Sequence, residues 1–287
     1  MKTQKSYNEN SIGTLYLVPT PIGNLEDMTF RAVRTLKEVD LIACEDTRVT
    51  QKLLNHFEID TAKMSYHEHN VHSHTTDLIN DLLAGKDIAQ VSDAGMPSIS
   101  DPGVELVAAA VSQNIPVVPL PGANAALTAL IASGLTPQPF TFYGFLSRKK
   151  SELTEELKSL KDKSETLMFY ESPHRLTSFL KELVTVFGEG RQVVLARELT
   201  KRYEEFIRGT AKEVYDWAKE TELRGEFVVL VAGNDEAEEE VYWEDWTVLE
   251  HIEYKITYEK MSSKDAIKAV AKERDLPKRE VYAEYHQ

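Results

Sequence analysis

The sequence has almost no cysteine and no long hydrophobic run. Cys44 is the single cysteine of 287 residues, which excludes an internal disulfide and a zinc site built from cysteines. It ends an apolar stretch, so we expect an inert, buried thiol. No apolar run approaches the roughly 20 residues that a membrane-spanning helix needs. The polar residues 1–11 do not resemble a secretory signal, so we expect a cytoplasmic protein with no membrane partner.

Positive charge is also scarce. There are 33 Lys and Arg against 47 Asp and Glu, a formal net charge of −14. This balance argues against a protein that bulk charge alone holds on nucleic acid. The charge is unevenly spread, however: residues 235–253 hold nine acids and no Lys or Arg, whereas residues 255–280 hold eight Lys and Arg against five acids. Either a solvated surface or a local basic groove is compatible with that second segment.

The common nucleotide and hydrolase motifs are missing as well. The sequence has no GxGxxG, GxxxxGK[ST], GxSxG or HExxH pattern. The loop over residues 19–25 is rich in proline, which donates no N–H, so we do not expect a pyrophosphate cradle there. A nucleoside-like ligand without phosphate fits this loop better.

Four histidines alternate in sequence, at positions 67, 69, 72 and 74. On a strand, this spacing would place them on one face, as a metal site requires. Residues 70–75 have the pattern of a helix start, which breaks the alignment. We therefore expect no metal site.

Apolar and amphipathic segments alternate through the first half of the chain. Short buried strands are predicted at residues 14–18, 41–44, 64–66, 88–91 and 116–119, each followed by a helical pattern. Five such repeats predict a doubly wound, mostly parallel α/β domain over residues 13–135, after a disordered tail over 1–12.

The second half has a different pattern. Strands are predicted at residues 140–145, 166–170, 192–196, 204–208 and 227–232, with helices at 150–161 and 174–187. The strands at 192–196 and 204–208 are close enough for a hairpin, which predicts a second α/β domain with a mixed sheet over 136–233. An acidic linker over 234–240 then leads to a helical, helix-turn-helix-like module over 241–287, with helices at 263–275 and 278–285.

The loop over residues 92–103 follows a buried strand and holds two aspartates among small residues. In open α/β sheets, ligands bind where strands end, so Asp93 is a candidate ligand contact. A tight turn explains Asp93 equally well. For Asp101 we expect a helix N-cap, with Pro102 at the first helical position.

Titratable side chains follow two other strands. Glu45, Asp46 and Arg48 come after the strand at 41–44, and Glu171, His174 and Arg175 come after the strand at 166–170. Each group also stands where a helix begins, so a capping role and a functional role are both open.

Eight motifs together resemble one family. They are GTLYLVPTPIGN (13–24), CEDTR (44–48), SYHEHN (65–70), VSDAGMPSISDPG (91–103), PGAN (121–124), FYESPHR (169–175), ARELT (196–200) and GEFV (225–228). In this order they resemble the bacterial small-subunit ribosomal RNA (cytidine-2′-O)-methyltransferases, of the tetrapyrrole-methylase-fold superfamily. The resemblance covers residues 13–233, and the C-terminal module also resembles that of the family.

This resemblance implies S-adenosylmethionine as methyl donor, bound in the cleft between the two α/β domains. It implies a cytidine ribose in the decoding region of 16S rRNA, within the small ribosomal subunit, as acceptor, and a homodimer. The implied donor-binding positions are Pro19, Pro21, Ile22, Asp93, Gly95, Met96, Gly122, Asn124 and Ala125. Phe145, Ala196 and Glu226 would close over the donor from the second domain. Met96 departs from the threonine that is frequent in the family.

Methyl transfer to a ribose hydroxyl needs alignment and help with a proton, because the hydroxyl is a poor nucleophile. We assign Glu45, Arg48 and Glu171 to catalysis, without choosing a base among them. His174, Arg175 and Arg197 are assigned to RNA binding. Two alternatives are a tetrapyrrole or diphthine-type methyltransferase of the same fold, and a non-catalytic ribosome-assembly factor.

Overall fold

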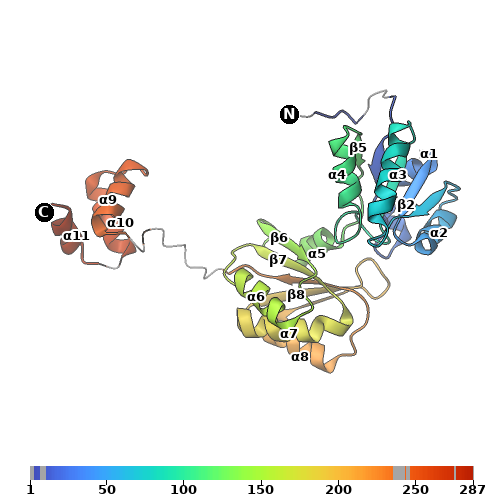
Figure 1. Ribbon diagram of the computed structural model, residues 1–287. Helices are drawn as coiled ribbons and strands as arrows, with labels where there is room; N and C mark the ends of the chain where they lie inside the picture. Colours follow the sequence, from blue (N-terminus) through green and yellow to red (C-terminus); the bar gives the residue numbers. More distant parts are fainter. Residues whose placement is uncertain (1–2, 7–10, 235–242, 244–245, 275, 287) are drawn as a thin grey trace. The chain divides into compact units, whose positions relative to one another are not determined.

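The computed structural model describes the chain except residues 1–2, 7–10, 235–242, 244–245, 275 and 287. The chain divides into two compact units, residues 1–235 and 236–287 (Figure 1). Each unit has apolar core clusters of its own. Most of the acidic linker expected over 234–240 lies outside the described residues. Within the described ranges, every helix is too short or too polar to cross a membrane.

The first unit begins with a fully parallel sheet. Its strands are β1 (Leu15–Leu17), β2 (Leu41–Cys44), β3 (Lys63–Ser65), β4 (Ile88–Val91) and β5 (Val117–Pro119). They lie in the order β3-β2-β4-β1-β5, with β4 paired to both β1 and β2. The parallel sheet predicted from the alternating pattern is confirmed.

Helices cover both faces of this sheet. A short 3₁₀ helix (Leu25–Asp27) precedes α1 (Phe30–Glu38), and α1 and α2 (Thr47–His56) pack on one face through Leu36 and Leu54. On the other face lie α3 (Val71–Leu83) and α4 (Val104–Ser112). The strands are short and buried, so each face contributes its own apolar cluster, which confirms the doubly wound arrangement.

Part of the N-terminal segment is described. The Gln4 side-chain amide exchanges two hydrogen bonds with the backbone of Val117, each 2.9 Å long. Within the tail that we predicted over residues 1–12, this side chain satisfies backbone groups at the edge of β5.

The second sheet is mixed, as predicted. Its strands are β6 (Phe140–Gly144), β7 (Thr166–Glu171), β8 (Gln192–Arg197), β9 (Glu205–Thr210) and β10 (Phe227–Val231), in the order β6-β7-β10-β8-β9. Only β6 and β7 are parallel within it. The predicted hairpin is confirmed, because β8 and β9 pair antiparallel with Gln192 opposite Thr210.

One helix crosses from the first sheet to the second. The sequence places α5 (Ala125–Ser133) after the last strand of the first domain. Its apolar side chains, however, pack with Met168 and Val228 of the second sheet. The opposite face of that sheet carries α6 (Lys150–Leu160), α7 (Pro173–Phe187) and α8 (Ala211–Glu220). Helix α5 therefore joins the two sheets of the first unit.

Two helices were missing from our prediction. Helix α8 follows β9 without a loop and begins at a capping box between Thr210 and Glu213. Helix α9 (Val248–Thr257) begins at a second capping box, between Thr247 and Glu250. Both signatures, T-x-x-E, are present in the sequence and mark a helix start.

The second unit is a small helical module. Helix α9 packs with α10 (Ser263–Glu273) and α11 (Lys278–Tyr285), which agree with the helices predicted there. Ile252, Ile267 and Val281 form a core of their own.

The expected cap of α4 is wrong. The helix predicted over residues 104–112 is confirmed, but Gly103 and not Asp101 is its N-cap residue, and Pro102 lies before the helix. The Gln90 side chain donates a hydrogen bond of 2.8 Å to the Pro102 carbonyl and holds this residue in the loop. Asp101 is thereby freed from a capping role.

Candidate active site

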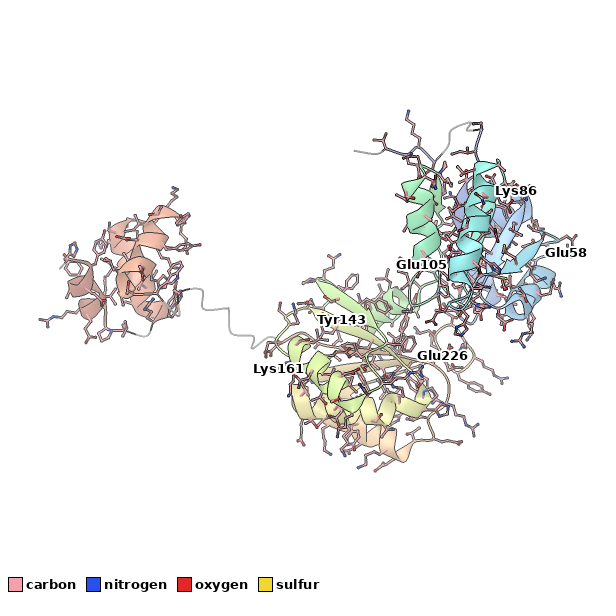
Figure 2. All side chains as sticks on the ribbon, viewed as in Figure 1. Glu58, Lys86, Glu105, Tyr143, Lys161 and Glu226 are labelled. Carbon is pink, nitrogen blue, oxygen red and sulfur yellow. The ribbon has the colours of Figure 1, made fainter. Side chains whose placement is uncertain are left out.

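A cavity of about 330 Å³ lies between loops of the two sheets in the first unit. The first sheet contributes Ile22 after β1, residues 94–96 and 99–101 after β4, and the N-terminus of α5. The second contributes the ends of β7 and β8 and the start of β10, where Figure 2 labels Glu226. This volume falls in the range of small-molecule sites.

The cavity stands where the order of the first sheet reverses. Strands β1 and β4 are neighbours in the order β3-β2-β4-β1-β5. After β1 the chain runs to β2, toward one edge of the sheet, whereas after β4 it runs to β5, at the opposite edge. The loops at their carboxyl ends therefore part at this point and leave a crevice. Ligands of open α/β sheets bind at such a switch point.

Backbone hydrogen bonds fix the loop after β4. Thr20 and Gly95 exchange two backbone hydrogen bonds of 2.9 and 3.0 Å, which tie this loop to the loop after β1. The Ser92 hydroxyl donates to the Gly95 carbonyl at 3.0 Å. Farther along, Ser98 and Ser100 adopt left-handed backbone conformations, with φ of 67° and 62°. Strain of this kind is typical of functional loops.

The structure brings many of the predicted donor-binding residues into one cavity. They are Ile22, Gly95, Met96, Asn124 and Ala125, with Phe145, Ala196 and Glu226 from the second sheet. Asn124 also caps α5, because its side-chain oxygen accepts a hydrogen bond from the Leu127 N–H at 2.9 Å. Met96 contributes its side chain to the wall.

The other predicted donor-binding residues lie elsewhere. Pro21 and Asp93 line a neighbouring cavity of about 250 Å³, together with Lys52 of α2. Pro19 and Gly122 pack on each other: a Cβ on Gly122 would come within 2.6 Å of the Pro19 Cβ. Their contact holds the loops after β1 and β5 together.

Two of the three carboxylates in the cavity wall have cationic partners. The side chain of Glu171 is 0% exposed and lies 3.2 Å from the Arg175 guanidinium. Burial nevertheless raises the pKa of Glu171. Glu226 accepts a hydrogen bond of 2.9 Å from the Lys201 ammonium.

The third carboxylate is Asp101, which sequence reasoning assigned to a helix cap. Among the described contacts it has neither a hydrogen bond nor an ion pair. Burial, followed by the charges of Glu45 and Asp93, raises the pKa of Asp101 to about 6. No sequence signal separates it from a capping aspartate, because only the position of Gly103 and Gln90 turns it toward the cavity. Tyr170, which also lines the cavity, was missed as well.

The predicted catalytic groups after β2 lie beside the cavity and not in its wall. Burial, then Asp93, raises the pKa of Glu45. Arg48 is 88% exposed and pairs with Asp46 at 2.6 Å, which lowers the pKa of Asp46 to about 2. Asp46 also caps α2 and donates its own N–H to Asp93 at 3.1 Å. The loops after β2 and β4 are thus connected through Asp93.

The predicted RNA-binding side chains differ in how firmly the protein holds them. Arg175 donates to the carbonyls of Leu146 and Ser147, in addition to its pairing with Glu171. Arg197 donates to the Arg224 carbonyl at 2.8 Å and pairs with Glu205. His174 is exposed on the first turn of α7. Both arginines are therefore held by the protein itself.

The composition of the wall suits a cationic nucleoside. Met96, Ala125 and Val228 supply apolar surface, and three carboxylates supply negative charge. Among the residues that line this cavity there is no Lys, Arg or His to bind phosphate. S-Adenosylmethionine, which carries a sulfonium and no phosphate, fits these walls. In the described part of the chain, no three His, Cys, Asp or Glu side chains gather as a metal site would require.

Comparisons with known proteins agree with this geometry. A family model for tetrapyrrole (corrin/porphyrin) methylases matches residues 14–215. Two relatives are each named ribosomal RNA small subunit methyltransferase I. The one from Bacillus subtilis is 56% identical over 100% of this chain and 99% of its own. The one from Halalkalibacterium halodurans is 55% identical over 100% of both.

A solved structure shares the fold. It is uroporphyrin-III C-methyl transferase from Thermus thermophilus, complexed with S-adenyl homocysteine. It aligns with a TM-score of 0.54 at 19% identity, over 77% of this chain and 97% of the other.

Proposed function

The chain belongs to the tetrapyrrole (corrin/porphyrin) methylase family, and from that premise we propose that it methylates small-subunit ribosomal RNA with S-adenosylmethionine as donor. The observation that carries this proposal is the full-length identity of 55–56% to two proteins named as small-subunit rRNA methyltransferases. The tetrapyrrole alternative rests on structural likeness at 19% identity, which supports the fold alone.

The motifs of the sequence support a finer proposal. The acceptor is the 2′-hydroxyl of a cytidine in the decoding region of 16S rRNA, presented within the small ribosomal subunit. The same resemblance supports a homodimer, and a ribosomal substrate places the protein in the cytoplasm.

The cavity between the two sheets is the proposed donor site. Ile22, Met96 and Ala125 supply apolar contacts from the first sheet, and Phe145 and Ala196 supply them from the second. When bound, S-adenosylmethionine supplies a methyl group activated by its sulfonium. The contribution of the protein is to hold the acceptor oxygen in line with that carbon. A site walled by two sheets can impose this alignment.

The polar residues have different proposed roles. Arg48 is exposed and extends from the start of α2, so it is suited to meet an RNA phosphate near the reacting ribose. Glu171 and Glu45 remain candidates for the proton. Arg175 and Arg197 are held in place, and we propose that they shape the RNA-binding edge beside the exposed His174.

Methyl transfer to isolated small subunits tests the function. The protein is incubated with labelled S-adenosylmethionine and small ribosomal subunits that lack the modification, and the RNA is digested to nucleosides. We expect 2′-O-methylcytidine. Label on a base would contradict the ribose assignment. Label on a porphyrinoid substrate, or donor binding without transfer to RNA, would support the respective alternative and overturn the proposal.

A further inference from the structure

The proposed reaction lacks an identified proton acceptor, and the cavity offers one carboxylate that no cation engages. Glu171 is paired with Arg175, and Glu226 with Lys201. Asp101, in the same wall, has no such partner among the described residues. A nearby guanidinium or ammonium makes a carboxylate a poorer proton acceptor than it would be without that cation, because the cation stabilises the ionised form.

The loop that carries Asp101 has backbone conformations that most residues disfavour. Ser98 and Ser100 both have positive φ, and Gly103 has φ of 141°. A Cβ at Gly103 would lie 1.7 Å from the Gln90 side-chain nitrogen, so the chain passes directly over Gln90. These constraints stop the helix from starting at Asp101 and turn the residue toward the cavity. Strain of this kind persists only where surrounding contacts impose it.

The surroundings of Asp101 come from both sheets. Glu45 and Asp93 act on it from the first, and Tyr170 and Glu171 lie in the same cavity from the second. Burial and the two neighbouring acids raise the pKa of Asp101 to about 6. A general base is most effective when its pKa lies near the working pH, because it is then both ionised and basic.

We propose that Asp101 is the general base that accepts the proton of the acceptor ribose hydroxyl. This inference rests on the proposed function. The hydroxyl oxygen forms a bond to the methyl carbon, and the carbon–sulfur bond breaks with its electron pair moving to sulfur. The sulfonium thereby becomes a neutral thioether. The O–H proton passes to the Asp101 carboxylate and then to water, so charge and atoms balance.

This assignment differs from the sequence-based candidates for a physical reason. Glu171 has the burial but also the partner Arg175. Glu45 lies outside the wall of the cavity and acts on it through the charge it places near Asp101. In the proposed site, Glu45 therefore acts indirectly, because its negative charge raises the pKa of Asp101. Asp101 itself contacts the acceptor.

The test compares Asp101→Asn and Asp101→Glu with the full-length wild type, and uses Asp77→Asn, on the exposed side of α3, as a matched control. Single-turnover methyl transfer to small subunits should fall roughly 10²- to 10⁴-fold in Asp101→Asn. Donor affinity, measured by calorimetry, should fall far less than the rate, because Asp101 is one of three carboxylates in the wall of the donor cavity. Asp101→Glu should recover part of the rate, and the control should match wild type throughout.

The pH profile distinguishes a base from a merely structural residue. The wild-type rate should rise with pH to a plateau, with a midpoint at or below about pH 6, because the bound sulfonium favours the ionised carboxylate. Asp101→Asn should lose this rise. Retention of the rise, or a loss of donor affinity that matches the loss of rate, would overturn the proposal.

Thermal stability as a function of pH tests the environment of the Asp101 carboxyl group without measuring activity. The raised pKa means that the folded protein favours protonated Asp101 more than the unfolded chain does. The melting temperature of wild type should therefore decline relative to Asp101→Asn as pH rises from about 4 through about 6. A constant difference would contradict the inference. If wild type binds donor but methylates no RNA, the proposed function itself has failed.

Discussion

At the scale of single residues, the cavity shows how partners determine what a carboxylate can do. Glu171, Glu226 and Asp101 lie in one wall, but only the first two have a cation within 3.2 Å. Arg175 offsets part of the rise that burial causes in the pKa of Glu171, whereas nothing among the described contacts of Asp101 offsets its burial. A carboxylate therefore forms a structural ion pair at Glu171 and Glu226, and remains without a cationic partner at Asp101.

Asp93 carries a prediction about the donor. Its carboxylate lines the neighbouring cavity and accepts the Asp46 N–H, so it connects the loops after β2 and β4. We expect Asp93→Ala to weaken donor binding by up to roughly tenfold, because losing the hydrogen bond to its charged carboxylate, at a cost of about 1.5–3 kcal/mol, would loosen the loop after β4 that also lines the donor cavity. Calorimetry measures the affinity, and circular dichroism checks that the fold is kept. Unchanged affinity would make Asp93 a turn residue only.

The buried pair of Glu171 and Arg175 carries a prediction about stability. Removing Arg175 would leave the fully buried carboxylate without its cation, so Arg175→Ala should lower the free energy of unfolding by about 3–5 kcal/mol. Denaturant titration measures the change. Arg48→Ala, at an exposed pair, serves as the matched control and should have little effect. A similarly small effect at Arg175 would show that the pair is dispensable for stability.

At the scale of elements, the loop between β4 and α4 is the part of the fold that most directly shapes the site. It leaves the sheet at its switch point, is tied to the loop after β1 at Gly95, and passes over Gln90 at Gly103. The delayed start of α4 follows from these contacts. The loop therefore forms part of the cavity wall and determines where Asp101 lies in it.

Gly103 tests this view of the loop. Its φ of 141° is costly for any other residue, and a Cβ would collide with Gln90. We expect Gly103→Ala to cost at least about 1–3 kcal/mol of unfolding free energy and to impair activity by displacing Asp101. Gly190→Ala is the control, because nothing lies within 4 Å of its Cβ position. Equal stability of the two variants would contradict the structural role of Gly103.

At the scale of the whole molecule, the donor cavity belongs to one compact unit, and the second unit has a core of its own. The first unit holds the cavity, whereas the second unit is a helical module closed by its own apolar residues. Lys and Arg exceed acids by eight to five over residues 255–280, although the protein carries a net charge of −14. Local positive charge can bind RNA phosphates even on an acidic protein.

Removing the module tests this division of labour. We expect deletion of residues 241–287 to spare donor affinity and to weaken binding and methylation of small subunits. Because fewer phosphates would be neutralised, the fall of RNA affinity with salt should also become shallower. Filter binding over a range of salt concentrations measures both effects. Full activity of the truncated chain would exclude an RNA-binding role for the module.

Local sequence patterns predicted most of the elements because they depend on near neighbours. Short apolar runs located all ten strands of the two sheets, and the loops after β1 and β4, which we predicted as ligand candidates, both line cavities. Helix α8 was missed although its T-x-x-E capping box is present, since it follows β9 without a break. Nothing in the local pattern of α5 shows which of the two sheets it covers.

The sequence by itself determined the two α/β sheets, the family resemblance and a ligand without phosphate, because hydrophobic spacing and the missing phosphate motifs are properties of the chain. Only the tertiary structure decided which aspartate faces the cavity. Asp101 and Asp93 share one loop, and their roles depend on contacts with other parts of the fold: Gln90 of β4, Glu45 after β2, and Tyr170 of β7. Burial and the charges of Glu45 and Asp93 raise the pKa of Asp101, and the burial and the approach of Glu45 do not exist before the sheet is packed.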